Sequence, residues 1–212
     1  MTTATGIAPR GKRSPRRTQA ERSAATRRKI IDAVVTVIAD EGFAQASAQR
    51  IAQRAGVTWG AVQYHFGAKA DILDAVLAEG VARFAQGVES LALEGRSLEQ
   101  RVGQLMHHCW AYCCSPHYRA MLEIALNARR GAARDPCEQH QRFAQVVREA
   151  WRSALADTDL DEAQRVEAER FACAALSGLA VQAMLRGGET RIRQDLKVLE
   201  RATLRLLGRS AE

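Results

Sequence analysis

Three short helical patterns, separated by tight turns, occupy residues 30–73 and restrict the fold more than any other feature of the chain. The first has apolar residues at helical intervals and ends at Gly42, which can adopt the left-handed conformation that closes a helix. Ser47 is a favourable N-cap for the second helix, and Thr58 for the third. Only about three residues around Gly56 separate these two helices. The sequence therefore predicts a helix-turn-helix within a three-helix unit.

The third helix of this unit is expected to present a polar face to the outside. Val62 and Phe66 lie four residues apart and should face the first two helices. Gln63 would then point outward, where its amide can form paired hydrogen bonds with an adenine edge in a major groove. Side chains near it can contact a thymine methyl group or the flanking phosphates. The predicted DNA contacts are Ser47, Ala48, Thr58, Trp59, Gly60, Gln63, Tyr64, His65 and Lys69.

The positive charge of the chain is concentrated in the same half. Residues 1–75 hold 12 Lys/Arg against 6 Asp/Glu, whereas residues 76–212 hold 19 against 18. This segregation is what a surface that binds a polyanion needs. The first 20 residues combine five Lys/Arg with two prolines and two glycines, which predicts a disordered basic arm over 1–20. The arm could reach phosphates or a minor groove, or it could be a solubilising tail with only non-specific attraction.

The helix-turn-helix segment carries five short motifs in a fixed order, namely Gly42-Phe43, Ile51-Ala52, Ala55-Gly56-Val57-Thr58, Tyr64-His65-Phe66 and Lys69. Over roughly residues 28–75 they resemble the N-terminal domain of TetR-type (TetR/AcrR) transcriptional regulators. The resemblance implies a homodimer on a palindromic operator, a variable C-terminal ligand domain and repression that a small-molecule effector releases. Gln63 departs from the family's frequent Tyr, which alters operator preference. Ala68 and Ala70 replace the frequent Ser and Glu beside Lys69, which weakens the cap of the next helix.

The rest of the chain consists of helical patterns divided by caps and breakers, so the predicted fold class is all-α. The helix-turn-helix domain is expected over 21–75 and an effector-binding and dimerisation domain over 76–212. Caps and breakers place six further helices at about 68–91, 97–115, from 115, 135–155, 161–186 and 191–207. An apolar signal-peptide region and a stretch of ~20 apolar residues are both missing, so a cytoplasmic protein without a membrane segment is expected.

The last two predicted helices carry apolar faces with small residues that permit close packing. Paired with their two-fold mates, they would form a four-helix bundle between two subunits. The same stripes could instead belong to the intramolecular core, and spacing alone does not separate these interpretations. The predicted dimer interface is Phe171, Ala174, Ala175, Gly178, Leu179, Leu196 and Leu199.

The segment MHHCWAYCCSPHYRAML concentrates aromatic, sulfur and imidazole side chains. It could line an effector cavity between helices, or it could be ordinary core, since free Cys and Met are commonly buried. The predicted effector contacts are His107, Trp110, Tyr112, Cys113, Met121, Glu123, Phe143 and Trp151.

A metal or thiol-redox sensor is a further interpretation of this segment. The helical spacing of Cys109, Cys113 and His117 favours a sensor, whereas Pro116 opposes it by ending the helix before His117. A Cys/His enzyme would need an orienting group and an oxyanion donor, and no local signature supplies them. The sequence also has no GxGxxG, P-loop or HExxH motif. We therefore predict no catalytic residue, cofactor or metal ligand.

Overall fold

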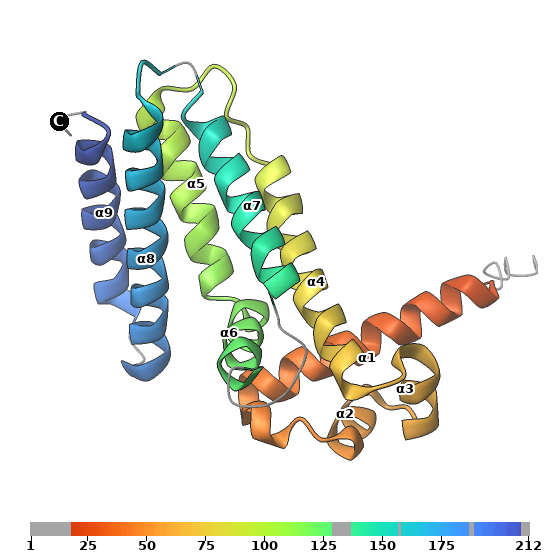
Figure 1. Ribbon diagram of the computed structural model, residues 1–212. Coiled ribbons are helices and arrows are strands. Elements are labelled where there is room, and N and C mark those ends of the chain that lie inside the picture. Colours follow the sequence, from red (N-terminus) through yellow and green to blue (C-terminus); the bar gives the residue numbers. More distant parts are fainter. Residues whose placement is uncertain (1–17, 129–136, 157, 187–188, 209–212) are drawn as a thin grey trace, which may run out of the picture.

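The computed structural model describes residues 18–128, 137–156, 158–186 and 189–208 (Figure 1). Over these ranges the regular structure is helical, so the all-α prediction is confirmed. The elements are α1 (Gln19–Glu41), the 3-10 turn η1 (Phe43–Gln45), α2 (Ala48–Ala55), α3 (Trp59–Phe66), α4 (Lys69–Glu89), α5 (Leu98–Cys113), α6 (Pro116–Ala128), α7 (Cys137–Ala154), α8 (Glu162–Arg186) and α9 (Glu189–Leu206). None of the described helices is both long and apolar enough to cross a membrane.

The molecule has a small head, α1 to α3, beside a larger body, α4 to α9 (Figure 1). Each part has its own apolar core, and α8 and α9 form the edge of the body that lies farthest from α4 (Figure 1). Burial of apolar side chains is the main stabilising contribution to each core. The head core includes Ile30, Val34, Ile38, Ile51, Val62, Phe66 and Ile72, and the body core includes Phe84, Leu105, Met106, Tyr112, Trp151, Leu155 and Leu176.

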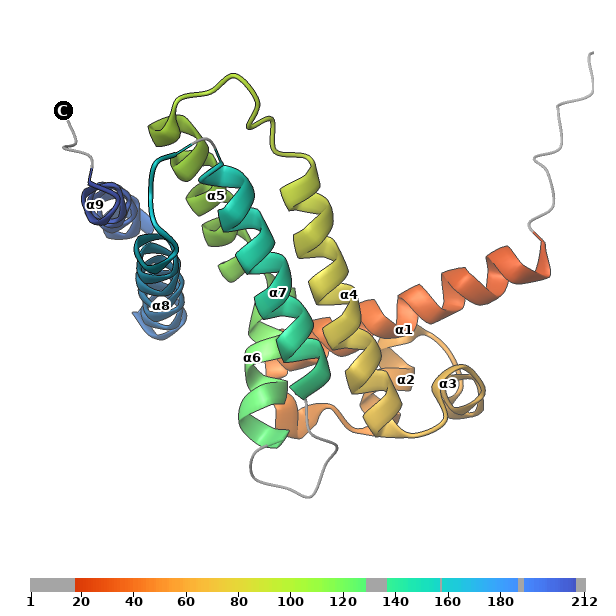
Figure 2. The same cartoon turned by 45° about the horizontal axis from the view of Figure 1, so that its top comes forward.

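Helix α1 begins eleven residues before the apolar stripe that starts at Ile30. Its N-terminus is a capping box, in which the Thr18 hydroxyl accepts from the Glu21 N–H and the Glu21 carboxylate accepts from the Thr18 N–H. The predicted arm over 1–20 is therefore wrong for residues 18–20, and residues 1–17 lie outside the described part. The first turns of α1 are largely exposed and project past α3 (Figure 2).

Helix α4 connects the two cores. Ile72 and Val76 belong to the head core, whereas Phe84, two to three turns later, belongs to the body core. The N-cap of α4 is Ala68, which has no capping side chain, but the Asp71 carboxylate accepts from the Ala68 N–H at 3.0 Å. That hydrogen bond supplies half of a capping box and offsets part of the predicted weakness of this cap.

Helix α6 also contributes to both cores. Ala120 and Ile124 pack in the head core, Tyr118 packs in the body core, and Met121 lies against both. The body therefore contacts the head through two helices, one covalently continuous with the head and one docked on it.

Two glycines allow close approach of α4 and α5. The Tyr112 hydroxyl lies 3.0 Å from the position that a Cβ would take at Gly80, and the His108 ring overlaps the corresponding position at Gly87. The His108 ring also contacts the Phe84 ring, with centroids 5.0 Å apart. A methyl group at Gly87 would displace His108. The packing of α5 on α4 therefore depends on the two spaces that the missing side chains of Gly80 and Gly87 leave, which we call the glycine notches.

Candidate nucleic-acid interface

The helix-turn-helix is built as the sequence predicts. The Ser47 hydroxyl accepts from the Arg50 N–H at 3.2 Å, and the Thr58 hydroxyl accepts from the Ala61 N–H at 3.2 Å. Gly56 closes α2 in the left-handed conformation, with φ of 65°. These caps fix both ends of the turn and set the direction of α3.

Helix α3 buries one face and exposes the other. Val62 and Phe66 are buried in the head core. Gly60, Gln63 and Tyr64 are exposed, and Tyr64 is 83% exposed. The buried face fixes α3 on the head, and the exposed face carries an amide and a phenol. A helix that reads DNA in the major groove has this arrangement.

The other predicted contacts surround this face with different degrees of exposure. Ser47 and Lys69 are exposed, Ala48 and His65 are half-buried, and Thr58 is exposed at the start of α3. Trp59 is half-buried against the head core rather than fully turned outward, because its ring covers apolar side chains. A ring in this position keeps only part of its edge available for contact with DNA.

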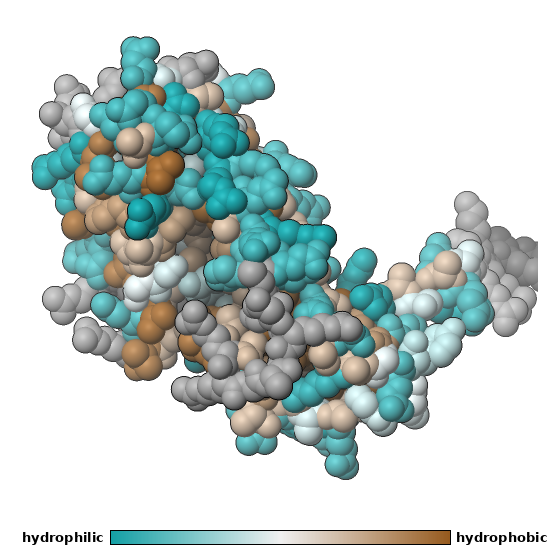
Figure 3. All heavy atoms as spheres, in the orientation of Figure 1, coloured by the Kyte–Doolittle hydropathy of each residue, from teal (hydrophilic) through white to brown (hydrophobic). Residues whose placement is uncertain are grey.

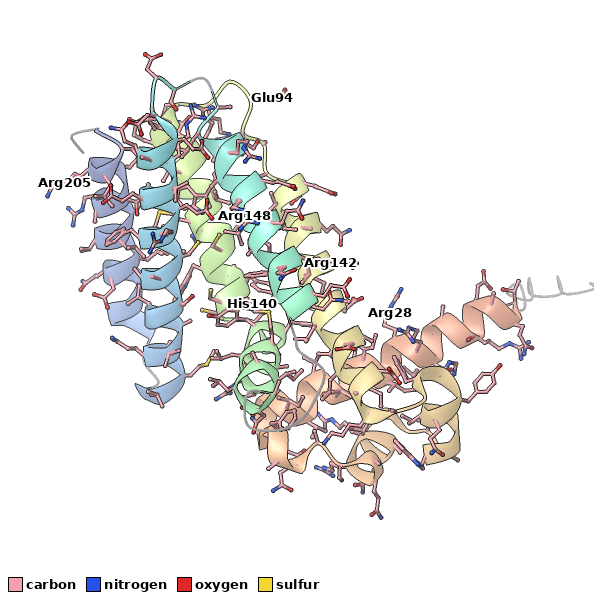
Figure 4. The ribbon with its side chains drawn as sticks, in the orientation of Figure 1. Arg28, Glu94, His140, Arg142, Arg148 and Arg205 are labelled. Carbon is pink, nitrogen blue, oxygen red and sulfur yellow. The ribbon has the colours of Figure 1, made fainter. Side chains whose placement is uncertain are left out.

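Arg27 also belongs to this surface, although no local sequence pattern indicates it. Its guanidinium donates to the His65 carbonyl at 3.2 Å and lies 4.2 Å from the centroid of the Phe66 ring. A cation at the C-terminus of α3 is favourable for the helix dipole. The two residues are 38 positions apart, so local sequence patterns could not reveal the contact. Arg28, one position later on α1, is exposed (Figure 4).

Arg50 has a structural partner. Its guanidinium donates to both carboxylate oxygens of Glu41, with the shortest distance 2.6 Å. This hydrogen bond lowers the pKa of the Glu41 carboxyl and raises the pKa of Arg50. The pair connects the start of α2 to the end of α1. A capping box would instead have Glu or Gln at the position of Arg50.

The comparisons with known proteins agree with this geometry. Residues 30–76 match the family described as bacterial regulatory proteins, tetR family. Along the described part, the fold resembles that of a transcriptional regulator from Rhodococcus sp. Rha1, with a TM-score of 0.72 and 19% identity over 84% of this chain and 96% of that one. The helix-turn-helix segment belongs to the TetR family. This segment is thus related to the DNA-binding segments of regulatory proteins.

Two further relatives of this chain are informative. The HTH-type transcriptional regulator SrpR of Pseudomonas putida is 48% identical over 63 residues, which are 30% of this chain and 29% of SrpR. The matched region thus spans less than a third of the length of that relative. The multidrug binding protein EbrR, solved as a complex with imidazole, is 27% identical with a TM-score of 0.56 over 94% of this chain and 97% of EbrR.

An aromatic cluster forms the centre of the body. Phe84 of α4, Tyr112 of α5 and Phe143 of α7 have ring centroids between 5.0 and 5.6 Å apart, and Tyr118 of α6 lies 5.9 Å from Tyr112. The Tyr112 hydroxyl is buried and has no hydrogen-bond partner. Burial raises the pKa of Tyr112, which keeps the phenol protonated and able to donate. The cluster therefore combines aromatic faces from four helices with an unpaired donor.

The other residues predicted to contact an effector separate into two groups. Cys113 and Trp151 are buried in the body core, and Trp110 and Met121 pack against it. His107 is exposed on α5, because it falls on the face opposite Met106 and Cys109. The Glu123 carboxylate accepts from the Phe43 N–H at 2.6 Å and so faces the head. The structure therefore does not bring these two predicted effector contacts together with the others in the body core.

A small cavity of about 10 Å³, the space of a single water, lies between α4, α6 and α7. Its lining includes Leu77 of the head core and Met121, which touches both cores. The side-chain oxygen of Gln139, also in the lining, is buried without a partner. An unpaired acceptor at this position would be satisfied by a ligand group or a water that donates.

The predicted dimer interface also separates into two groups. Leu199 is only 6% exposed and belongs to the body core, and Ala175, Leu179 and Leu196 pack against that core. Phe171, Ala174 and Gly178 are exposed. Further exposed apolar side chains continue their face, namely Val181, Leu185, Val198 and Leu206. Spacing alone could not separate these groups, because α8 is apolar on more than one face.

Burial raises the pKa of three cysteine thiols, so these thiols ionise less readily. Burial raises the pKa of Cys113 to about 12 and that of Cys173 to about 11, and it raises the pKa of Cys109 further. Cys114 is exposed. His117 lies in the first turn of α6, whereas Cys109 and Cys113 lie on α5, as the position of Pro116 predicts. Within the described ranges, no three His, Cys, Asp or Glu side chains are grouped so as to hold a metal ion.

We expect the thiols with raised pKa to resist alkylation in the folded protein. At pH 8 a thiol with a pKa of about 11 is ionised to only about one part in a thousand, and the thiolate is the reactive form. Iodoacetamide followed by peptide mass spectrometry should label Cys114 and leave Cys109, Cys113 and Cys173 unmodified until denaturant is added. Rapid labelling of Cys109 or Cys113 without denaturant would contradict this assignment and favour a thiol sensor.

Proposed function

We propose that this protein is a homodimeric repressor that binds a palindromic DNA operator and is released from it by a small-molecule effector. The observation that carries the proposal is the exposed polar face of α3, held by the two caps above the buried Val62 and Phe66. The outward amide of Gln63 can form paired hydrogen bonds with a base edge when α3 lies in a major groove.

The proposed DNA contacts divide into those that read bases and those that position the head. Gln63 faces outward from the middle of α3 and would read a base edge, with Gly60 allowing the backbone to approach. Tyr64 and Lys69 would reach phosphates on either side. Ser47, Ala48, Thr58, Trp59 and His65 remain proposed contacts at the ends of α2 and α3.

The exposed face of α8 and α9 supports the homodimer. Leu185 is 80% exposed, and hydrophobic side chains appear along the edge where these two helices lie (Figure 3). A groove of about 500 Å³ runs between the helices and is lined by Phe171, Val198, Ala202 and Leu206, with Glu167, Arg201 and Arg205 beside them. Gly178 has open space around it, which permits close approach of a second helix. A two-fold copy would cover these apolar side chains and form a four-helix bundle.

The aromatic cluster supports an apolar or aromatic effector. Phe84, Tyr112 and Phe143 offer ring faces, and the unpaired Tyr112 hydroxyl would donate to an acceptor on the ligand. EbrR, whose fold this chain shares, is described as a multidrug binding protein. An effector that enters among these rings must separate α4 from α5 and α7, because the rings are already in contact.

The release mechanism follows from the position of α4. This helix carries side chains of both cores, so a displacement in the body moves the N-terminus of α4 and the head attached to it. Helix-turn-helix dimers match half-sites about 34–36 Å apart, so a shift of a few ångströms in each head prevents simultaneous docking. The effector and the operator are then coupled reciprocally.

Substitutions at Gln63 and Lys69 should have different effects on DNA binding. Gln63→Ala should cost about 1–3 kcal/mol on the operator and remove the preference at one position in each half-site. Lys69→Ala should weaken all sequences equally and reduce the salt slope by roughly one unit. Binding titrations on an operator library at several salt concentrations measure both effects. If Gln63→Ala weakened binding to all sequences equally, Gln63 would contact the DNA backbone and not a base edge.

Gly178→Arg should produce a folded monomer. The position is open to solvent in one subunit, so an arginine fits there, but in the proposed bundle it would be a buried, unpaired charge. Sedimentation should show the monomer mass, circular dichroism should be unchanged, and specific operator binding should be lost. Ala82→Arg, which adds the same charge at an exposed position of α4, is the matched control. A dimeric Gly178→Arg protein would place the interface elsewhere.

Effector binding should be visible in tryptophan fluorescence. In a Trp59→Phe background, Trp110 and Trp151 report only on the body. An apolar effector should change their emission and weaken operator binding over the same concentration range. Tyr112→Phe should reduce effector affinity by about three- to tenfold, the value of one hydrogen bond, with little change in DNA affinity. His107→Ala is the control, and an equal effect of this exposed residue would contradict the assigned site.

A further inference from the structure

We propose that Glu123 is a positioning residue that holds Lys69 against the DNA backbone by acting through Phe43. The inference rests on the proposed function, because it requires Lys69 to contact a phosphate. It assigns Glu123 a role in DNA binding rather than in effector binding, and it places the second body–head connection at one carboxylate.

The chain of contacts begins on α6. The Glu123 carboxylate accepts from the Phe43 N–H at 2.6 Å, across 80 positions of sequence, and the bond is partly buried. The preceding Gly42 has φ of 90°, a conformation that favours glycine, and it turns the backbone so that this N–H faces α6. Hydrogen bonds with a charged acceptor are among the stronger ones in proteins. The bond therefore fixes where Phe43 begins the η1 turn.

The chain of contacts continues from Phe43 to the DNA side of the head. The Lys69 ammonium lies 5.2 Å from the centroid of the Phe43 ring, within the range of a cation–π interaction. Lys69 is the first residue of α4, so both its side chain and its backbone lie where the helix begins. Phe43 thus limits the positions that the ammonium can adopt. A displacement of α6 would move Phe43 and withdraw this support from Lys69.

Glu123 is also placed to report the state of the body. Its neighbours on α6, Ala120 and Ile124, pack in the head core, and Met121 lies against both cores. The same helix carries Tyr118, which contacts Tyr112 in the aromatic cluster. An effector among these rings would therefore displace α6, and Glu123 would transmit that displacement to Lys69 independently of the covalent path through α4.

The first test uses hydrogen–deuterium exchange in the free protein. Glu123→Ala should accelerate exchange of the peptide that contains Phe43 by about tenfold, because its amide loses its acceptor. Glu123→Gln should restore much of the protection, since an amide oxygen can also accept. Asn127→Ala, one turn later on α6, is the matched control, because the Asn127 side chain donates to the Glu123 backbone carbonyl, at 2.8 Å, and not to its carboxylate. Unchanged exchange at Phe43 in Glu123→Ala would overturn the proposal.

The second test is a double-variant cycle on an operator fragment that the wild-type protein selects from genomic DNA. Glu123→Ala should weaken binding by about three- to tenfold and lower the salt slope, and Glu123→Gln should recover most of the loss. Glu123→Ala combined with Lys69→Ala should bind no more weakly than Lys69→Ala alone, because both changes remove the same contact. Additive losses in the cycle would overturn the proposal.

Failure of the proposed function would look different. If Lys69→Ala leaves the salt slope unchanged, Lys69 does not contact a phosphate, and both that contact and the inference fail. If Lys69→Ala lowers the slope while Glu123→Ala does not, the phosphate contact stands and only the role of Glu123 fails. The recovery by Glu123→Gln separates a positioning role from a general loss of folding, which a glutamine would not correct.

Discussion

The sharing of α4 between two apolar cores is the constraint on which the rest of the structure depends. Ile72 and Val76 of α4 belong to the head core, and Phe84 of α4 belongs to the body core. These side chains are on one continuous helix, so neither core can rearrange without a force on the other. Interiors packed at crystal-like density transmit such displacements rather than absorb them. The connection between the proposed ligand site and the proposed DNA contacts therefore needs no flexible linker.

Local sequence signals predicted the head well because its structure is local. The caps at Ser47 and Thr58, the left-handed Gly56 and the buried pair Val62 and Phe66 each follow from residues within a few positions. The start of α1 was missed for a related reason. The apolar stripe begins only at Ile30, whereas the first turns of α1 are exposed and begin at a capping box without apolar residues beside it.

Contacts between distant elements could not be predicted in the same way. His107 and Glu123 are polar residues on helices that the sequence placed correctly, yet one faces solvent and the other faces the head. Their directions depend on how α5 and α6 rotate against their neighbours, and helical periodicity leaves that rotation open on a helix with more than one apolar face. Leu199 illustrates the same limit, because its stripe fits an interface and a core equally well.

The glycine notches of α4 have a mechanical consequence. Tyr112 and His108 occupy the notches at Gly80 and Gly87 in reverse order, so α4 and α5 run antiparallel, and two separate side chains fix the axial position of α4. A ligand that removes Tyr112 from its notch leaves His108 at Gly87 as a pivot. From Gly87 to Lys69 the helix is about 27 Å long, at about 1.5 Å per residue. A tilt of only about 6° around that pivot moves the start of α4 by about 3 Å, which makes α4 a lever with its long arm at the DNA.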